Sequence, residues 1–463
     1  MADWYVNINN TSGTADGLSE ATGWTDLNDV NDNEWGRGIT GGDRLFIKAG
    51  ESGATYGLVG SNVNFYTSGF NMRIDGNGTN NEPVEIIGYP FDGTTNDIPM
   101  NEDRPAIYCE RTNGAAFGLY GGHIAKHLRF IVPAYTLDNL VAQVVVNGSG
   151  SRMANCSVTK LDGAGGGDRA GVIDHSSGAE VEGCEFEDQT TDVNWPTRDD
   201  GYNCNFTSFS GSTPKGCVFK QNTTSYFFRY RTTYGTEVWR NCIFISNGNA
   251  LGILEGSLLG HAAGYSTVRF ENCIFYNMDV GFNPMVPVDA SSIDTETEWR
   301  SRSFKMSAEN CIFENCGTGV LVPSYTDPSG WTTGSFYMNH VVQLSNCVFA
   351  LNTTNTSGDL TETNSIYASG SVFKDAPNGD FRLNDIAGRG ALVKERLPNF
   401  EMNLILSGAV KQNPRPVNTF ISPFTITDEG SLSLGTGDVE DIVTVSGRSF
   451  QKVSDNPIVW RRV

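Results

Sequence analysis

The stretch Asn272-Cys273-Ile274-Phe275 recurs along this chain with small changes. Each full copy has an asparagine or glycine, a cysteine, a variable residue and a phenylalanine, and the other full copies are 183–186, 216–219, 241–244, 310–313 and 346–349. Weaker copies that fit the same frame lie at 127–130, 155–158 and 370–373. The cysteine positions of successive copies are 24 to 38 residues apart. Such self-similarity indicates a solenoid, in which each repeat packs on its neighbours.

The hydrophobic pattern around the motif indicates which solenoid it is. Apolar residues alternate in Val268-Arg269-Phe270-Glu271, and Cys273 and Phe275 alternate on the opposite parity. A period of two is typical of strands, so the change of parity marks a corner between two strands. Asparagine and glycine enter left-handed backbone conformations at the least cost, as a tight corner requires. The sequence therefore predicts an all-β fold, a parallel β-helix whose cysteines and phenylalanines point inward in columns.

The ten cysteines are best interpreted as core residues. Their regular inward spacing favours buried free thiols over a disulfide framework, and unpaired thiols in this number suit assembly in a reducing cytosol. One further match to the motif, Asn203-Cys204-Asn205-Phe206, lies only 13 residues before Cys217. Because that interval is too short for a full coil, we assign Cys204 to another strand of the same coil.

The composition argues against several kinds of partner. A formal net charge of −21 disfavours nucleic acid and anionic membranes. The sequence has no run of 18 apolar residues that would span a bilayer. The residues after Met1 lack the basic and apolar regions of a signal peptide. We expect that a signal was removed or that the protein is made in a cytosol and leaves by another route.

Four segments of the chain differ in character. We predict an N-terminal cap over 1–80, the parallel β-helix over 81–385, a lid and linker over 386–425 and a small C-terminal β module over 426–463. The longest intervals between copies of the motif place loops near 286–302 and 323–335. Loops on one face of a solenoid often form its binding surface.

Short sequences at both ends of the predicted β-helix carry a resemblance to a known superfamily. They are Trp4-Tyr5-Val6-Asn7, Gly17-Leu18-Ser19, the stretch 42–50 (GDRLFIKAG) and Asp380-Phe381-Arg382-Leu383. With these, the chain resembles the pectin-lyase-like superfamily of right-handed parallel β-helix proteins, over roughly residues 1 to 390. The resemblance implies the fold. It does not fix the function, since the superfamily includes pectate and alginate lyases, glycoside hydrolases, epimerases and phage tailspikes.

Candidate catalytic residues fall at comparable places in successive coils: Asp174, His175, Asp200, Arg229, Arg231 and Glu255. In a lyase, Arg229 and Arg231 would neutralise a sugar carboxylate and His175 would remove the adjacent proton. In a glycosidase, two carboxyl groups would act as a pair, with Asp174, Asp200 and Glu255 as candidates. The alternative is an ordinary charged wall, in which the arginines pair with Asp199 or Asp200.

Aromatic and acidic residues suggest two binding functions. The candidate carbohydrate-binding residues are Trp195, Tyr202, Tyr230 and Trp331. Aromatic rings near arginines suit sugar binding, but they are also ordinary packing residues. The acidic run of Glu185, Glu187, Asp188 and Asp192 is a candidate Ca²⁺ site, although a solvated loop is the favoured interpretation. No cofactor is otherwise expected.

Two functions of different classes follow from these observations. The first is a phage virion surface protein, a homotrimeric tailspike-like or capsid-decorating β-helix that contacts other virion proteins and binds host glycans. The alternative is a secreted polysaccharide lyase or glycoside hydrolase acting on an acidic polysaccharide. A bacterial adhesin is a third option. The sequence leaves open whether any bond is cleaved.

Overall fold

The computed structural model describes the chain in segments. The described residues are 2–27, 39, 41–59, 63–66, 74–75, 83–99, 103–110, 116–120, 122–132, 144–147, 150–161, 173–176, 179–189, 204–209, 214–221, 226–231, 235–247, 265–282, 303–322, 341–407, 409–410, 442–445, 448–455 and 458–462. The chain separates into two compact units, Met1–Val410 and Lys411–Val463.

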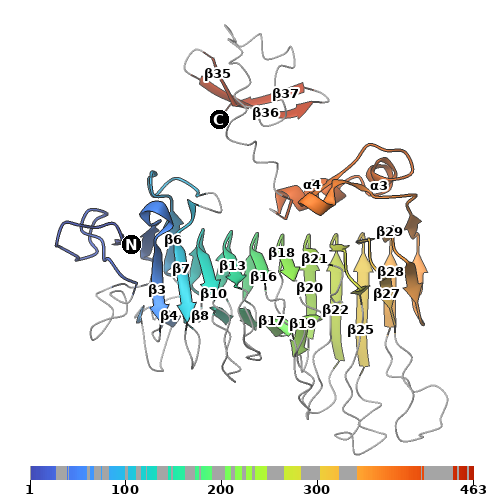
Figure 1. Cartoon of the computed structure of the whole chain (residues 1–463), viewed down its shortest axis with the longest axis horizontal. Helices are drawn as coiled ribbons and strands as arrows, with labels where there is room; N and C mark the ends of the chain where they lie inside the picture. The colour runs from blue at the N-terminus through green and yellow to red at the C-terminus, as the bar shows by residue number, and fades with distance from the viewer. Residues whose placement is uncertain are drawn as a thin grey trace, which may run out of the picture. The chain divides into compact units, whose positions relative to one another are not determined.

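The first unit consists mainly of three long parallel walls, which we call sheets A, B and C (Figure 1). Sheet A contains β1 (Asp3–Val6), β2 (Arg44–Lys48), β6 (Glu85–Tyr89), β9 (Ile124–Lys126), β12 (Arg152–Ala154) and β15 (Glu180–Glu182), and after a bridge through Lys215 it continues as β20 (Gly235–Arg240), β22 (Tyr265–Glu271), β25 (Ser303–Glu309), β28 (Val341–Ser345) and β31 (Thr361–Thr363). Sheet B contains β3 (Thr55–Val59), β7 (Ala106–Glu110), β10 (Arg129–Val132), β13 (Ser157–Lys160), β16 (Glu185–Asp188), β18 (Val218–Gln221), β21 (Ile243–Ser246), β23 (Ile274–Tyr276), β26 (Ile312–Glu314), β29 (Val348–Ala350) and β32 (Ile366–Tyr367).

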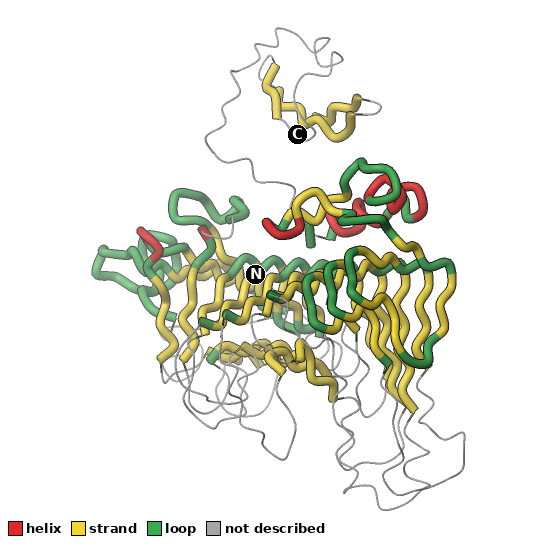
Figure 2. Tube along the Cα trace, turned by 45° about the vertical axis from the view of Figure 1, so that its right-hand side comes forward, coloured by secondary structure: helices red, strands yellow, loops and turns green. Residues whose placement is uncertain are grey.

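Sheet C and a short fourth sheet, sheet D, complete the coils. Sheet C contains β4 (Val63–Tyr66), β5 (Ile74–Asp75), β8 (Phe117–Tyr120), β11 (Val144–Asn147), β14 (Ile173–Ser176), β17 (Cys204–Phe209) and β19 (Tyr226–Arg231), and sheet D contains β24 (Val280–Phe282), β27 (Thr318–Leu321) and β30 (Thr354–Ser357). The chain passes from sheet C to sheet A to sheet B, as in β8, β9 and β10, and successive coils stack in register (Figure 2). This is the predicted parallel β-helix, and Cys204 begins a strand of another wall, as expected.

From β9 onward, a left-handed corner joins sheet A to sheet B, and the corner residues form what we call the corner column. The asparagines and glycines of the motif have positive φ there, such as 60° at Asn272 and 65° at Gly216. The asparagines also support one another, since Asn272 Nδ2 donates to Asn241 Oδ1 at 3.0 Å. The corner thus explains why the motif begins with these two residue types.

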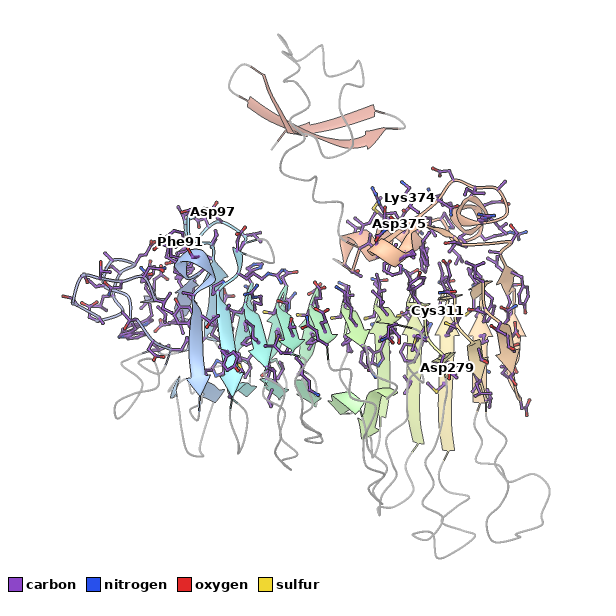
Figure 3. The ribbon with its side chains drawn as sticks, in the orientation of Figure 1. Phe91, Asp97, Asp279, Cys311, Lys374 and Asp375 are labelled. Atoms are coloured by element: carbon purple, nitrogen blue, oxygen red, sulfur yellow. The ribbon has the colours of Figure 1, made fainter. Side chains whose placement is uncertain are left out.

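The inward columns of cysteine and phenylalanine are confirmed. The nine cysteines whose side chains are described are free and buried. Rings of successive coils stack face to face, with centroids 5.0 Å apart for Phe244 and Phe275 and 4.7 Å apart for Phe275 and Phe313. Figure 3 labels Cys311 within this stack of strands.

The final copy of the motif is not the one predicted at 370–373. Phe373 lies in β33 (Phe373–Asp375), which pairs antiparallel with β34 (Asp380–Leu383) outside the coils. The last corner is Asn364, with φ of 56°, and Tyr367 of β32 continues the ring column beyond Phe349. Serine and tyrosine replace cysteine and phenylalanine in this copy, so the C-x-F pattern does not reveal it.

Residues 370–410, which we call the side cover, fold back onto the outer face of sheet B. The side cover contains β33, η4 (Ala376–Asn378), β34, α3 (Gly390–Arg396) and α4 (Phe400–Leu406). Its apolar side chains form one buried cluster with those of sheet B, including Ile243, Ile274, Ile312, Val348, Phe373, Phe381, Val393, Phe400 and Leu404. The helices lie over the later strands of sheet B, and Lys374 and Asp375 belong to this cover (Figures 1 and 3). Part of the segment predicted as lid and linker therefore packs against the β-helix.

Elements at the two ends of the chain complete the fold. Strands β1 to β4, within the segment predicted as an N-terminal cap, pair within sheets A, B and C, and η1 (Glu51–Gly53) precedes β3. The second unit contains an antiparallel sheet of β35 (Ile442–Val445), β36 (Arg448–Asp455) and β37 (Ile458–Arg462). Among the described residues, no helix has the length and apolar character needed to cross a membrane.

Candidate functional site

The register of sheet C fixes the positions of four of the six predicted catalytic residues. Asp174 pairs with Thr207 of β17, and Thr207 pairs with Arg229 of β19. Arg231 pairs with Phe209. Because neighbouring strands are about 4.8 Å apart, the backbones at Asp174 and Arg229 are separated by about 10 Å. One register column thus contains an acidic position and a basic position with a threonine between them.

Strand alternation divides the predicted residues between two faces of sheet C. Successive residues of a strand belong to opposite faces, so Asp174 and His175 do not share one. Arg229 and Arg231 are two residues apart and share the face of Asp174. His175 instead shares a register column with Val146 of the hydrophobic core, whereas Val145, in the column of Asp174, is buried outside that core. The register therefore brings together Asp174, Arg229 and Arg231, which we call the sheet C column.

Several predicted residues lie outside the described part of the chain. These are Asp200, Glu255, Trp195, Tyr202 and Trp331. Tyr230 is in β19, in the register column of Ser208 and His175. The roles assigned to all these residues, the homotrimer and the virion-surface location stay predictions.

The acidic run lies mainly in β16 of sheet B and not in a loop, and Asp192 is outside the described residues. The Glu185 carboxylate is paired with Lys220 Nζ. Within the described segments, no group of three or more histidine, cysteine, aspartate or glutamate residues is arranged to hold a metal ion.

A second feature, which sequence analysis did not identify, lies at the corner between sheets A and B. His127 has φ of 59° and occupies the corner column where later coils have asparagine or glycine. Burial, Arg104 and Lys126 together lower the pKa of His127 to about 4, so its imidazole is neutral at pH 7. The sequence signal that could have identified this feature is the departure from the motif at position 127, where a histidine replaces the usual asparagine or glycine.

Comparisons with known proteins give matches to solved structures alone. No family model and no curated protein match this chain. Among solved structures, it is similar to a rhamnogalacturonan lyase, with 13% identity, a TM-score of 0.49 and coverage of 86% of this chain and 98% of that chain. A similar match is the pectate lyase Pel9A, with 13% identity, a TM-score of 0.46 and coverage of 83% and 89%.

A third match is a mannuronic acid specific polysaccharide lyase from human gut microbiota. Its identity is 11%, its TM-score is 0.35, and the match covers 79% of this chain and 94% of that chain. The fold itself follows from the strand order and register of this chain: it is a parallel β-helix with a side cover on sheet B.

Proposed function

We propose that this chain binds an acidic polysaccharide along the outer face of sheet C and cleaves it by β-elimination. The observation that carries the proposal is the sheet C column, in which acidic and basic positions share one face. An arginine is suited to a carboxylate because its planar guanidinium donates two parallel hydrogen bonds. The strands of Asp174 and Arg229 are about 10 Å apart, so a sugar lying across β17 could contact both positions.

In this reaction, Arg229 and Arg231 bind the carboxylate of a uronate residue. As the proton leaves the carbon next to that carboxylate, negative charge develops on its oxygens and the arginines stabilise it. Asp174 accepts the proton. The electron pair of the broken C–H bond forms a C=C bond, the C–O bond to the neighbouring sugar breaks, and the leaving oxygen takes up a proton from water. His175, the other candidate base, belongs to the opposite face of the strand.

The test is an assay of the full chain on polyuronates of different sugar composition, followed by ultraviolet absorbance of the unsaturated product. Loss of one stabilising donor from an active site typically costs about 100- to 1,000-fold in rate, so Arg229→Gln should lose that much. Asp174→Asn should lose a comparable factor. The matched control is Arg269→Gln, since Arg269 is a half-exposed arginine of sheet A that pairs with Glu271 and Glu309.

Two results would overturn the proposal. Polyuronate binding without any unsaturated product would indicate a binding protein, as expected for the predicted virion function. Activity that survives both Arg229→Gln and Asp174→Asn but disappears in His175→Ala would move the chemistry away from the sheet C column.

A further inference from the structure

Three basic side chains gather where sheet A turns into sheet B in the early coils. Arg104 lies immediately before Pro105, which accepts a hydrogen bond from the backbone N–H of Arg129. This pairing aligns Arg104 with His127, one coil later in the corner column. Arg129 follows His127 by two residues and lies on the outer face of sheet B, in register with Ala106. We call Arg104, His127 and Arg129 the basic corner.

One buried nitrogen of each residue lacks a hydrogen-bond partner among the described residues. These nitrogens are Arg104 Nε, Arg129 Nε and His127 Nδ1. Leaving such an atom unsatisfied typically costs about 1–3 kcal/mol, more for a charged group. A ligand would offset this cost only by accepting hydrogen bonds from these nitrogens themselves, so its binding must open a path to them.

Within the described segments, no carboxylate forms an ion pair with an arginine of the basic corner. Among the ion pairs of the described residues, none involves Arg104 or Arg129, whereas Lys126 nearby is paired with Glu85 at 3.2 Å. In sheet A, by contrast, Arg240 and Arg269 each pair with a glutamate. In a chain with a net charge of −21, carboxylates are abundant, so two half-buried arginines that pair with none of the described carboxylates are unexpected.

The neighbouring surface suits a sugar. Tyr108 and Ile131 are register partners on the outer face of sheet B, and both are half-buried. Thr159 follows Ile131 in the same column. The helices of the side cover lie over later strands of sheet B, beyond β10 and β13 (Figure 1). An aromatic ring, an aliphatic side chain and a hydroxyl thus lie beside the basic corner.

We propose that the basic corner is an oxyanion-binding site that takes the carboxylate of an acidic sugar, with Tyr108 and Ile131 contacting the sugar ring. Arg104 and Arg129 donate to the carboxylate, and His127 lies beside both, in register with Arg104 and two residues before Arg129. The site is separate from the sheet C column, and its existence does not depend on cleavage.

The experiment is an NMR titration of the His127 imidazole in the full chain, with its signal assigned by its absence in His127→Asn. D-galacturonate should raise the pKa of His127, because a bound anion opposes the effect of Arg104 and Lys126. Neutral D-galactose should leave this pKa unchanged. In the Arg104→Gln variant without ligand, the pKa of His127 should be higher than in the native protein. The affinity of this variant for galacturonate should fall about tenfold, because it loses one charged hydrogen bond.

The control Arg269→Gln keeps the full response to galacturonate. Three results would each overturn the site. The pKa of His127 could stay unchanged with galacturonate, it could respond equally to galactose, or its response could be undiminished in Arg104→Gln. A response to inorganic phosphate without one to galacturonate would overturn the acidic-sugar assignment. The Arg229→Gln variant should retain the response of His127 to galacturonate even if it has no lyase activity. If Arg229→Gln abolishes that response, the bound carboxylate lies on sheet C instead.

Discussion

Gly216→Ala should be strongly destabilising, because two separate effects meet at this corner. Gly216 has φ of 65°, which disfavours any residue with a Cβ. A Cβ there would lie 2.0 Å from the backbone oxygen of Ser407, at the end of α4. The substitution therefore strains the corner and also forces the side cover away from sheet B.

The two effects have different sizes. Left-handed backbone strain costs about 1–2 kcal/mol for an alanine. Ordinary contact begins near 3.4 Å, so Ser407 would have to retreat by about 1.4 Å. Such overpacking typically costs about 1–3 kcal/mol, because the movement disturbs buried neighbours such as Leu404. We expect a total loss of about 2–5 kcal/mol in the free energy of unfolding.

Gly53→Ala is the matched control, since Gly53 has φ of 80° and nothing within 4 Å of the added Cβ. It should show the backbone strain alone. Urea unfolding of both variants gives the difference in stability, and hydrogen exchange of residues 400–410 reports on the side cover. Equal losses in the two variants, with unchanged exchange at α4, would refute the proposed contact.

Three further predictions concern the core and the side cover. Phe275→Ala should cost about 3–5 kcal/mol, because its ring stacks on Phe244 and Phe313; a loss below about 1 kcal/mol in urea unfolding would contradict the ring column. The nine buried thiols should react with a thiol reagent only on unfolding, because none of them is accessible in the folded chain; rapid labelling of these residues in the native protein would contradict their burial. At Cys316 and Cys109 burial also raises the pKa, to about 12 at Cys316, which slows the reaction of these two further. Burial raises the pKa of Glu314 above its usual value, although Ser371 and the Val372 N–H donate to it. Its stabilising contribution is therefore full below the unfolded pKa and lost as pH rises through the folded pKa. Urea titrations should show that the free energy of unfolding of the native protein, relative to Glu314→Gln, falls as pH rises from the unfolded to the folded pKa of Glu314. A difference that stays constant or increases over this pH interval would contradict the prediction.

The corner motif predicted the coils because it combines two local requirements. Left-handed backbone needs Asn or Gly, and the interior needs Cys and Phe. Both requirements are met within four residues, so the pattern is visible without any long-range information. The final coil was missed because Asn364 is followed by serine and then Tyr367, which satisfy the same geometry with other side chains.

The side cover left a signal in the variable position of the motif. That position is Ile243, Ile274, Ile312 and Val348 in the covered coils, and all four are buried under the side cover. In earlier coils it is Ser157 and Glu185. A continuous column of apolar residues on an outer face implies something that covers it. The covering segment itself could not be identified, because its contacts join residues far apart in the chain.

The candidate site was predictable only in part. Strand alternation alone separates Asp174 from His175, which are adjacent in β14. The register that aligns Asp174 with Arg229 depends on loop lengths between coils, and no local pattern gives these. The basic corner depends on missing partners, which only the structure reveals.

The most direct test of the proposed function is a crystal structure of the Asp174→Asn variant with a bound oligouronide. We predict a uronate carboxylate against Arg229 on the outer face of sheet C, with the adjacent carbon facing residue 174. An oligouronide bound only elsewhere on the chain, with Arg229 making no contact to a carboxylate, would contradict the proposal.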